Sequence, residues 1–194
     1  MYRAVLDTCA LVPGRQRDFL LQLAVEEAYA PLWGSGILVE LDYVLARLDA
    51  KRGRDGSEER RQHLFEQMTL AFPGAEINAP KDREYDYDLD DADDGHVAHT
   101  AILGKADAIV TDDSRAGFKT SVILRESGVD VFHPYEFAAN TVAAHPEAGI
   151  RALVAMSQRM TTPAQSPREV LEELRARYGM DEVAEILAPL LPAD

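Results

Sequence analysis

The sequence contains a single cysteine, no long run of apolar residues and too few basic residues to balance its acidic ones. Cys9 alone cannot form an internal disulfide, which agrees with a reducing compartment. No apolar stretch approaches the roughly 20 residues that a membrane-spanning helix needs, and the N-terminal segment lacks a basic region followed by a long apolar core. These absences predict a cytoplasmic protein that does not enter a membrane.

The shortage of basic residues leaves a net charge of -14 at pH 7. Such a balance argues against a nucleic-acid partner, because binding phosphates needs a basic surface. The charge is unevenly distributed, however: eight of the acidic residues lie between residues 82 and 94, whereas Arg47, Lys51, Arg52 and Arg54 form a basic stretch. Ordinary helix ends and a linker are the simpler interpretation of that stretch, and contact with an RNA backbone is the alternative.

The order of apolar segments predicts an α/β fold. Four short stretches with strand character are separated by segments of helical length, and they lie at 3–7, 75–79, 106–112 and 128–133. The helical segments are 17–29, 35–48, 57–71, 93–105 and 118–127. This alternation favours a parallel sheet covered by helices. With 194 residues, 46% of them hydrophobic, the chain can form one main core with an appendage.

The C-terminal part of the sequence shows helical patterns without a strand signal. Ser166, Pro167 and Glu169 have the spacing of a capping box that begins with proline, which predicts a helix start. We therefore expect a main domain over residues 1–140 and a helical C-terminal extension over residues 141–194.

Acidic residues follow two of the predicted strands directly. Asp7 comes after the first strand, and Asp112 and Asp113 come after the strand near residue 109. Parallel strands end at the same edge of a sheet, where α/β proteins bind their ligands. Taken singly, each acid is better explained by helix capping.

Two further acids fit the same location. Glu40 lies next to the apolar stripe of its predicted helix, where an unpaired carboxylate is costly to bury. Asp94 stands at the start of the helix expected over 93–105. Carboxylate oxygens suit Mg²⁺ or Mn²⁺. Zinc is less suited, because Cys9, His96 and His99 do not complete a zinc ligand set. These two histidines could be ligands, but surface or core histidines are more common.

Four stretches taken together resemble the PIN domain, and specifically its VapC-like ribonuclease branch: "LDTCAL", "SGILVELDYVL", "DADDGHVAHTAILGKADAIVTDD" and "GVDVFHPYEF". The resemblance covers roughly residues 3 to 137. It implies a three-layer α/β/α sandwich and a metal-dependent endoribonuclease, the toxin of a type II toxin–antitoxin pair. The family's catalytic and metal-binding acids fall on Asp7, Glu40, Asp94 and Asp113, with Mg²⁺ or Mn²⁺ as the cofactor.

The same resemblance implies auxiliary residues and partners. Asp93, Thr111 and Asp112 stand where they can support the four acids, whereas Cys9 replaces the Asn or Ser that the family often has at that position. The implied partners are an RNA substrate, a cognate antitoxin and a second copy of the chain in a homodimer. The weaker RNA-binding candidates are the basic residues Arg47, Lys51, Arg52 and Arg54.

Two other interpretations are considered. A catalytically degenerate PIN fold could act as a scaffold or as a nucleic-acid-binding module, although the complete set of four acids argues against it. A receiver-like phosphoacceptor domain would share the acidic strand ends. It would need a lysine after a later strand, where this sequence has His133 and Pro134.

Overall fold

The computed structural model describes residues 1–53 and 56–192. The chain divides into two compact units. One, here called the sheet unit, comprises Arg3–Val12 and Pro31–Val131. The other, the helical unit, comprises Met1–Tyr2, Pro13–Ala30 and Phe132–Asp194.

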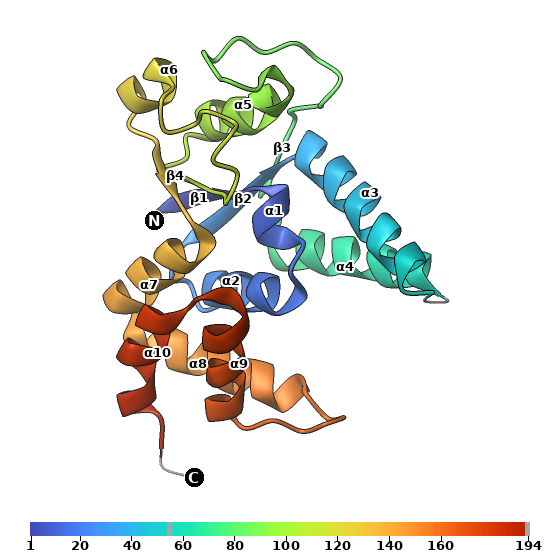
Figure 1. The fold of residues 1–194 in the computed structure, drawn as a ribbon. Helices are drawn as coiled ribbons and strands as arrows, with labels where there is room; N and C mark the ends of the chain where they lie inside the picture. Colours follow the sequence, from blue (N-terminus) through green and yellow to red (C-terminus); the bar gives the residue numbers. More distant parts are fainter. Residues whose placement is uncertain (54–55, 193–194) are drawn as a thin grey trace. The chain divides into compact units, whose positions relative to one another are not determined.

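Five parallel strands form one sheet in the order β3-β2-β1-β4-β5. Their bounds are Arg3–Leu6 (β1), Ala30–Gly34 (β2), Glu76–Ile77 (β3), Ala108–Val110 (β4) and Asp130–Phe132 (β5), and Figure 1 shows four of them labelled. In the central pair, Ala4 lies opposite Ala108 and Leu6 opposite Val110, and all four are fully buried. Complete burial of central strands is typical of parallel sheets covered on both faces. The predicted α/β class with a parallel sheet flanked by helices is confirmed.

Strand β2 was not predicted from the sequence. Its residues read "APLWG", and both Pro31 and Gly34 are typical of turns rather than strand interiors. The strand is nevertheless buried along most of its length. Gly34 is required by packing, because a Cβ atom there would lie 2.3 Å from Oγ1 of Thr100.

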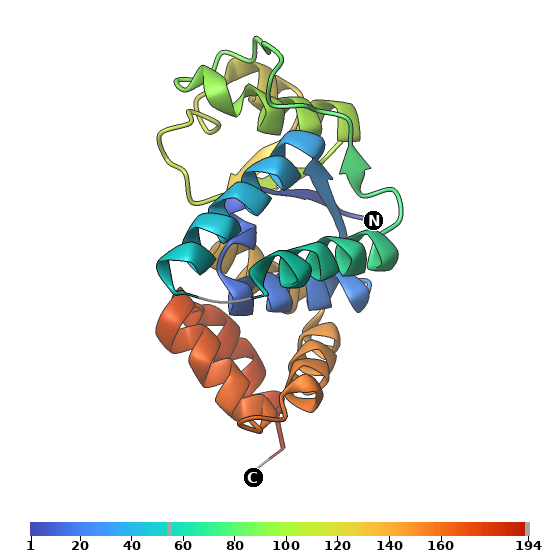
Figure 2. The same ribbon diagram turned by 90° about the vertical axis from the view of Figure 1, so that its right-hand side faces the viewer.

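The helices of the sheet unit are α1 (Thr8–Leu11), α3 (Ser35–Lys51), α4 (Ser57–Ala71), α5 (Gly95–Gly104) and α6 (Val122–Glu126), with a 3₁₀ turn η1 at Ala92–Asp94. Helix α5 packs on β1, β3 and β4 through its small residues, and Val97 and Ala101 are fully buried. Helices α3 and α4 pack against each other (Figure 2). The helix expected over 118–127 begins later, at Val122. Gly117 has a left-handed φ of 82°, and the hydroxyl of Ser121 accepts from the N–H of Leu124 as the N-cap.

The helical unit contains α2 (Gly14–Val25), α7 (Pro134–Ala144), α8 (Pro146–Arg159), α9 (Pro167–Tyr178) and α10 (Asp181–Leu187), ending in the 3₁₀ turn η2 (Ala188–Leu190). The expected capping box at the start of α9 is present, with Ser166 and Glu169 bonding each other's backbone. Helix α2 packs on α7, α8 and α9, so the C-terminal helices share their core with a helix from the N-terminal part of the chain. None of the described helices is long and apolar enough to cross a membrane.

Candidate active site

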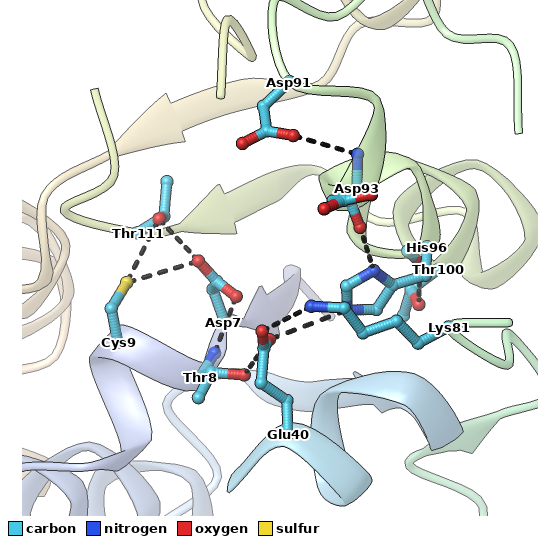
Figure 3. Close-up of polar contacts among 10 residues, drawn as sticks. All are labelled: Asp7, Thr8, Cys9, Glu40, Lys81, Asp91, Asp93, His96, Thr100 and Thr111. Carbon is cyan, nitrogen blue, oxygen red and sulfur yellow. Dashed lines mark hydrogen bonds and ion pairs between the residues drawn. The ribbon is translucent and has the colours of Figure 1, made fainter. Parts of the chain in front are cut away.

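Asp7 stands where β1 ends and α1 begins, and its carboxylate is almost completely buried. Oδ1 accepts a hydrogen bond of 2.6 Å from the N–H of Thr8, so Asp7 does cap a helix. The other oxygen, Oδ2, accepts from the hydroxyl of Thr111 at 2.7 Å (Figure 3). Burial raises the pKa of Asp7, and these bonds only partly oppose that effect. Capping therefore accounts for Oδ1 of Asp7, whereas Oδ2 is bonded to a side chain from the end of another strand.

Thr111 links the ends of two strands. Its hydroxyl donates to Asp7, and the same oxygen accepts a 3.0 Å bond from the N–H of Asp113. The Asp113 carboxylate accepts from the N–H of Arg115 at 2.8 Å, in a loop where no helix begins before Val122. Asp113 is thus not a helix cap, and a threonine hydroxyl fixes its backbone relative to Asp7.

Cys9 makes two hydrogen bonds beside Asp7. Its thiol donates to Oδ2 of Asp7 at 3.2 Å, and its sulfur accepts from the N–H of Asp112 at 3.2 Å. Burial and the neighbouring charge of Asp7 raise the pKa of the thiol. Cys9 is therefore a neutral hydrogen-bonding group here rather than a thiolate nucleophile.

Glu40, on α3, has both carboxylate oxygens engaged. Lys81 donates to Oε1 at 2.5 Å, and the hydroxyl of Thr8 donates to Oε2 at 2.9 Å (Figure 3). The Glu40 side chain is 26% exposed. Burial alone would raise the pKa of Glu40, but the bonds from Lys81 and Thr8 outweigh it and lower the pKa below its ordinary value. Glu40 is consequently ionised and held in place near neutral pH.

His96 is fully buried beside this glutamate. Its Nδ1 lies 2.9 Å from the carbonyl oxygen of Asp93, which can only accept, so Nδ1 carries a proton. Nε2 lies 3.8 Å from Oε2 of Glu40 and has no hydrogen-bond partner among the described residues. Because burial lowers the pKa of His96, the ring is neutral and its free lone pair faces the carboxylate.

Asp94 ends η1 and immediately precedes α5, and within the described chain its side chain caps no backbone N–H. Burial, followed by the charges of neighbouring carboxylates, raises its pKa to about 7. The carboxylates that contribute are Asp7, Asp91, Asp113 and Glu40. Asp94 therefore lies within electrostatic reach of the other three predicted site acids.

The four acids fit a hard divalent cation by their chemistry. Such a cation prefers carboxylate oxygens, and it would relieve the repulsion that raises the pKa of Asp94. Among the residues that the structure describes, however, no three His, Cys, Asp or Glu side chains already form a ligand set around one point. The carboxylate oxygens of Asp7 and Glu40 instead accept hydrogen bonds from donors of the chain itself, among them Thr111 and Lys81.

The auxiliary acids contribute through their backbones. Asp93 supplies the carbonyl that fixes His96, and Asp112 supplies the N–H that fixes Cys9. The carboxylate of Asp91 accepts from the N–H of Asp93 at 3.0 Å and so caps η1.

The predicted RNA-binding residues lie at the far end of the helix that carries Glu40. Arg47, Lys51 and Arg52 are exposed at the end of α3, whereas Arg54 lies outside the described residues. The guanidinium of Arg47 lies 5.6 Å from the ring centre of Tyr43, which is 61% exposed.

Lys81 and Thr8 were not among the residues predicted from the sequence. Both hold Glu40, but Lys81 lies 41 positions away from it, in an acidic loop without periodicity. Thr8 follows Asp7 directly, and this position beside the first acid is the sequence feature that could have indicated it as a site residue.

Two family models match the chain. One, described as PIN domain, matches residues 3–115, more than half of the chain and including all four site acids. The other, described as VapC50 C-terminal domain, matches residues 134–189, from α7 to η2. Searches of curated proteins and of solved structures found no match.

Proposed function

Because the chain belongs to the PIN-domain family, in its VapC-like branch, we propose that it is a divalent-metal-dependent endoribonuclease and the toxin of a type II toxin–antitoxin pair. The observation that carries the proposal is the electrostatic coupling of the acids. Asp94 is half-buried, and this burial together with the charges of neighbouring carboxylates raises its pKa to about 7. A fold gains nothing from such crowding, whereas a cation site needs it.

Asp7, Glu40, Asp94 and Asp113 would hold Mg²⁺ or Mn²⁺. When bound, the cation would supply an activated water and stabilise charge on the attacked phosphate. The chain's other residues position these acids: Thr111 bonds to the side chain of Asp7 and the backbone of Asp113, and Thr8 bonds to Glu40. Asp94 is only partly ionised near pH 7, so binding a cation there would release its proton.

The outer end of α3 supports RNA as the substrate. Arg47 is seven residues beyond Glu40 on the helix, a rise of about 10 Å, and the two lie on the same face. Tyr43 lies between them on that face and exposes its ring, which suits stacking of an unpaired base. Arg47, Lys51 and Arg52 would together offer the RNA backbone a local basic surface on an acidic protein.

The proposal is tested with purified protein and RNA. Wild-type protein should cleave single-stranded or loop RNA in Mn²⁺ or Mg²⁺, and a chelator should stop the cleavage. Asp7→Asn should abolish it while circular dichroism shows an unchanged fold. Retained cleavage by the folded Asp7→Asn protein would refute the assignment of the site.

The same proposal places the protein in the cytoplasm, where an antitoxin would neutralise it by covering the acidic site with an Arg or Lys side chain. A second copy of the chain would form a homodimer. Co-expression with the product of a short neighbouring gene should yield a stable complex that no longer cleaves RNA.

The Lys81–Glu40 ion pair favours one alternative. If the ammonium occupied Glu40 permanently, the chain would be a degenerate PIN-fold scaffold that binds nucleic acid without cleaving it. Calorimetry separates the two functions, because the scaffold would bind no Mn²⁺ even at millimolar concentration.

A further inference from the structure

Lys81 is a cation that the fold places on one of the four site carboxylates, Glu40, and the exposed Arg115 lies near another, with its Nε 3.7 Å from Oδ1 of Asp113. Lys81 lies in the segment after β3, and its Nζ donates to Oε1 of Glu40 (Figure 3). The Lys81 side chain is 37% exposed. Its ammonium can therefore leave Glu40 without crossing the protein core.

The backbone around Lys81 is fixed to the start of the helix that bears Glu40. The N–H of Gly36 donates to the carbonyl of Ala79 at 3.0 Å, and the N–H of Ala79 donates to the hydroxyl of Ser35 at 3.1 Å. A Cβ atom on Gly36 would lie only 2.9 Å from the backbone nitrogen of Lys81. The approach of Lys81 to Glu40 is therefore built into the fold and is not a chance meeting of surface side chains.

The surroundings make Lys81 a shared counter-ion. Burial would lower the pKa of Lys81, but the hydrogen bond and charge of Glu40, together with Asp94 and Asp93, raise it above its ordinary value. Nε2 of the buried His96 lies 3.8 Å from Oε2 of Glu40, which is beyond hydrogen-bonding distance. Lys81 thus provides the positive charge within hydrogen-bonding distance of this carboxylate in the metal-free protein.

We propose that Lys81 binds a phosphate of the substrate, and that Glu40 holds the Lys81 ammonium in the metal-free protein. Once Glu40 serves as a metal ligand, the ammonium loses its partner at the place where the phosphate of the substrate must enter. An RNA phosphate then takes over as the anion that Lys81 binds. This inference rests on the proposed function and adds to it a substrate-binding residue outside the four acids.

The first experiment measures Mn²⁺ binding without RNA. In calorimetry, Lys81→Met should bind Mn²⁺ about tenfold more tightly than wild type, because the competing cation is gone. Lys81→Arg keeps the charge and should stay within about threefold of wild type. Arg83→Met, which removes an exposed cation two positions away, is the matched control and should leave the affinity unchanged.

The second experiment measures the use of RNA at saturating Mn²⁺. Lys81→Met should raise the KM for a single-stranded RNA oligonucleotide about tenfold, and Lys81→Arg should restore it to within about threefold of wild type. Arg83→Met should again behave as wild type. Circular dichroism of each variant checks that the fold is intact.

A purely structural lysine would give different results. The inference is overturned if Lys81→Met binds Mn²⁺ no more tightly than wild type, or if its KM is unchanged. If wild-type protein cleaves no RNA with any metal, the proposed function fails. In that case the role of Lys81 is still tested by the Mn²⁺ titration and by the affinity of each variant for a labelled oligonucleotide, measured by fluorescence anisotropy.

Discussion

At the residue scale, one hydroxyl couples two of the site acids. Thr111 donates to the carboxylate of Asp7 and accepts from the backbone of Asp113, at 2.7 and 3.0 Å. Asp7 lies after β1 and Asp113 after β4, so Thr111 sets the spacing between two neighbouring strand ends. Groups that orient metal ligands in this way contribute strongly to metal affinity and activity.

Replacing Thr111 by valine, which has nearly the same shape, removes the hydroxyl that contacts Asp7, Cys9 and the backbone of Asp113. We expect RNA cleavage by Thr111→Val to fall by about 10- to 100-fold. Thr111→Ser keeps the hydroxyl and should retain most of the activity. Steady-state kinetics on one RNA oligonucleotide measure the effect, and a valine variant within about threefold of wild type would refute the role of Thr111.

Asp94 makes the stability of the metal-free protein depend on pH. Its pKa is about 7 in the fold and 3.8 without these surroundings, chiefly because of burial. Between these two values the folded state holds a proton that the unfolded chain has lost. The stability that this proton provides is present at low pH and is lost as the pH rises towards 7. The raised pKa of Asp7 acts in the same direction, whereas the lowered pKa of Glu40 matters only at more acidic pH.

We therefore expect Asp94→Asn, which cannot ionise, to unfold at a higher temperature than wild type at pH 8 in the presence of chelator. At pH 5 the difference should be smaller, because only part of this stability has been lost there. Thermal unfolding between pH 5 and 8 provides the measurement. Melting temperatures that change in parallel for the two proteins would show that Asp94 is not the group responsible.

The sequence was informative about these acids because each follows a strand or lies in a helix with a clear apolar pattern. Asp7 and Asp113 could be placed at one sheet edge from strand order alone. Lys81 could not be placed there, because no periodicity indicates where an irregular loop directs a lysine. The partners of Glu40 depend on tertiary contacts across 41 and 32 positions of sequence.

At the scale of elements, the start of α3 is where packing and the site meet. Gly36 lies one helical turn before Glu40. A Cβ atom there would lie 2.7 Å from Cδ2 of His96 and 2.8 Å from the carbonyl oxygen of Ala79. The absence of a side chain at this position allows the segment with Lys81 to approach the helix closely.

Gly36→Ala should destabilise the protein by about 1–3 kcal/mol, since the methyl group overpacks against backbone that cannot move aside cheaply. Urea unfolding gives the free energy of unfolding. Gly14→Ala in α2 is the matched control, because its Cβ would be 3.7 Å from the nearest atom, an ordinary contact. Equal stability of Gly36→Ala and wild type would contradict the close packing of α3 on this segment.

The elements that sequence patterns missed are those whose residues have poor intrinsic preferences. Strand β2 contains Pro31 and ends in Gly34, and it is held by its neighbours in the sheet rather than by propensity. Helix α6 starts four residues later than expected, because residues 118–120 form a turn that the N–H groups of Thr120 and Ser121 close on the carbonyl of Gly117. By contrast, α4 and the capped α9 agree with the pattern, since their start signals are local in sequence.

At the scale of the whole molecule, the net charge of -14 must be reconciled with an RNA substrate. Much of that charge lies in the loop before α5, and some of it would be neutralised by a bound divalent cation. The basic residues at the end of α3 are exposed and form a separate region on the sheet unit. RNA binding would therefore depend on a few local cations rather than on total charge.

This distribution predicts a small salt dependence of RNA binding, to which Arg47 and Lys51 each contribute. Removing Arg47 or Lys51 by substitution with Met should each reduce the slope of log affinity against log salt by about 0.7. Anisotropy titrations of a labelled RNA oligonucleotide at several salt concentrations measure the slope. Arg177→Met, on α9, is the control and should leave the slope unchanged. Equal slopes for all variants would show that the RNA does not bind along the end of α3.

The central claim is that the four acids form one divalent-cation site, and calorimetric titration of the protein with Mn²⁺ tests it most directly. Wild-type protein should bind Mn²⁺ saturably at millimolar concentration or below, Asp7→Asn and Asp94→Asn should each lose this binding, and Asp130→Asn, an exposed acid on β5, should retain it. Wild-type protein that binds no Mn²⁺, or folded Asp7→Asn and Asp94→Asn proteins that bind it as wild type does, would contradict the claim.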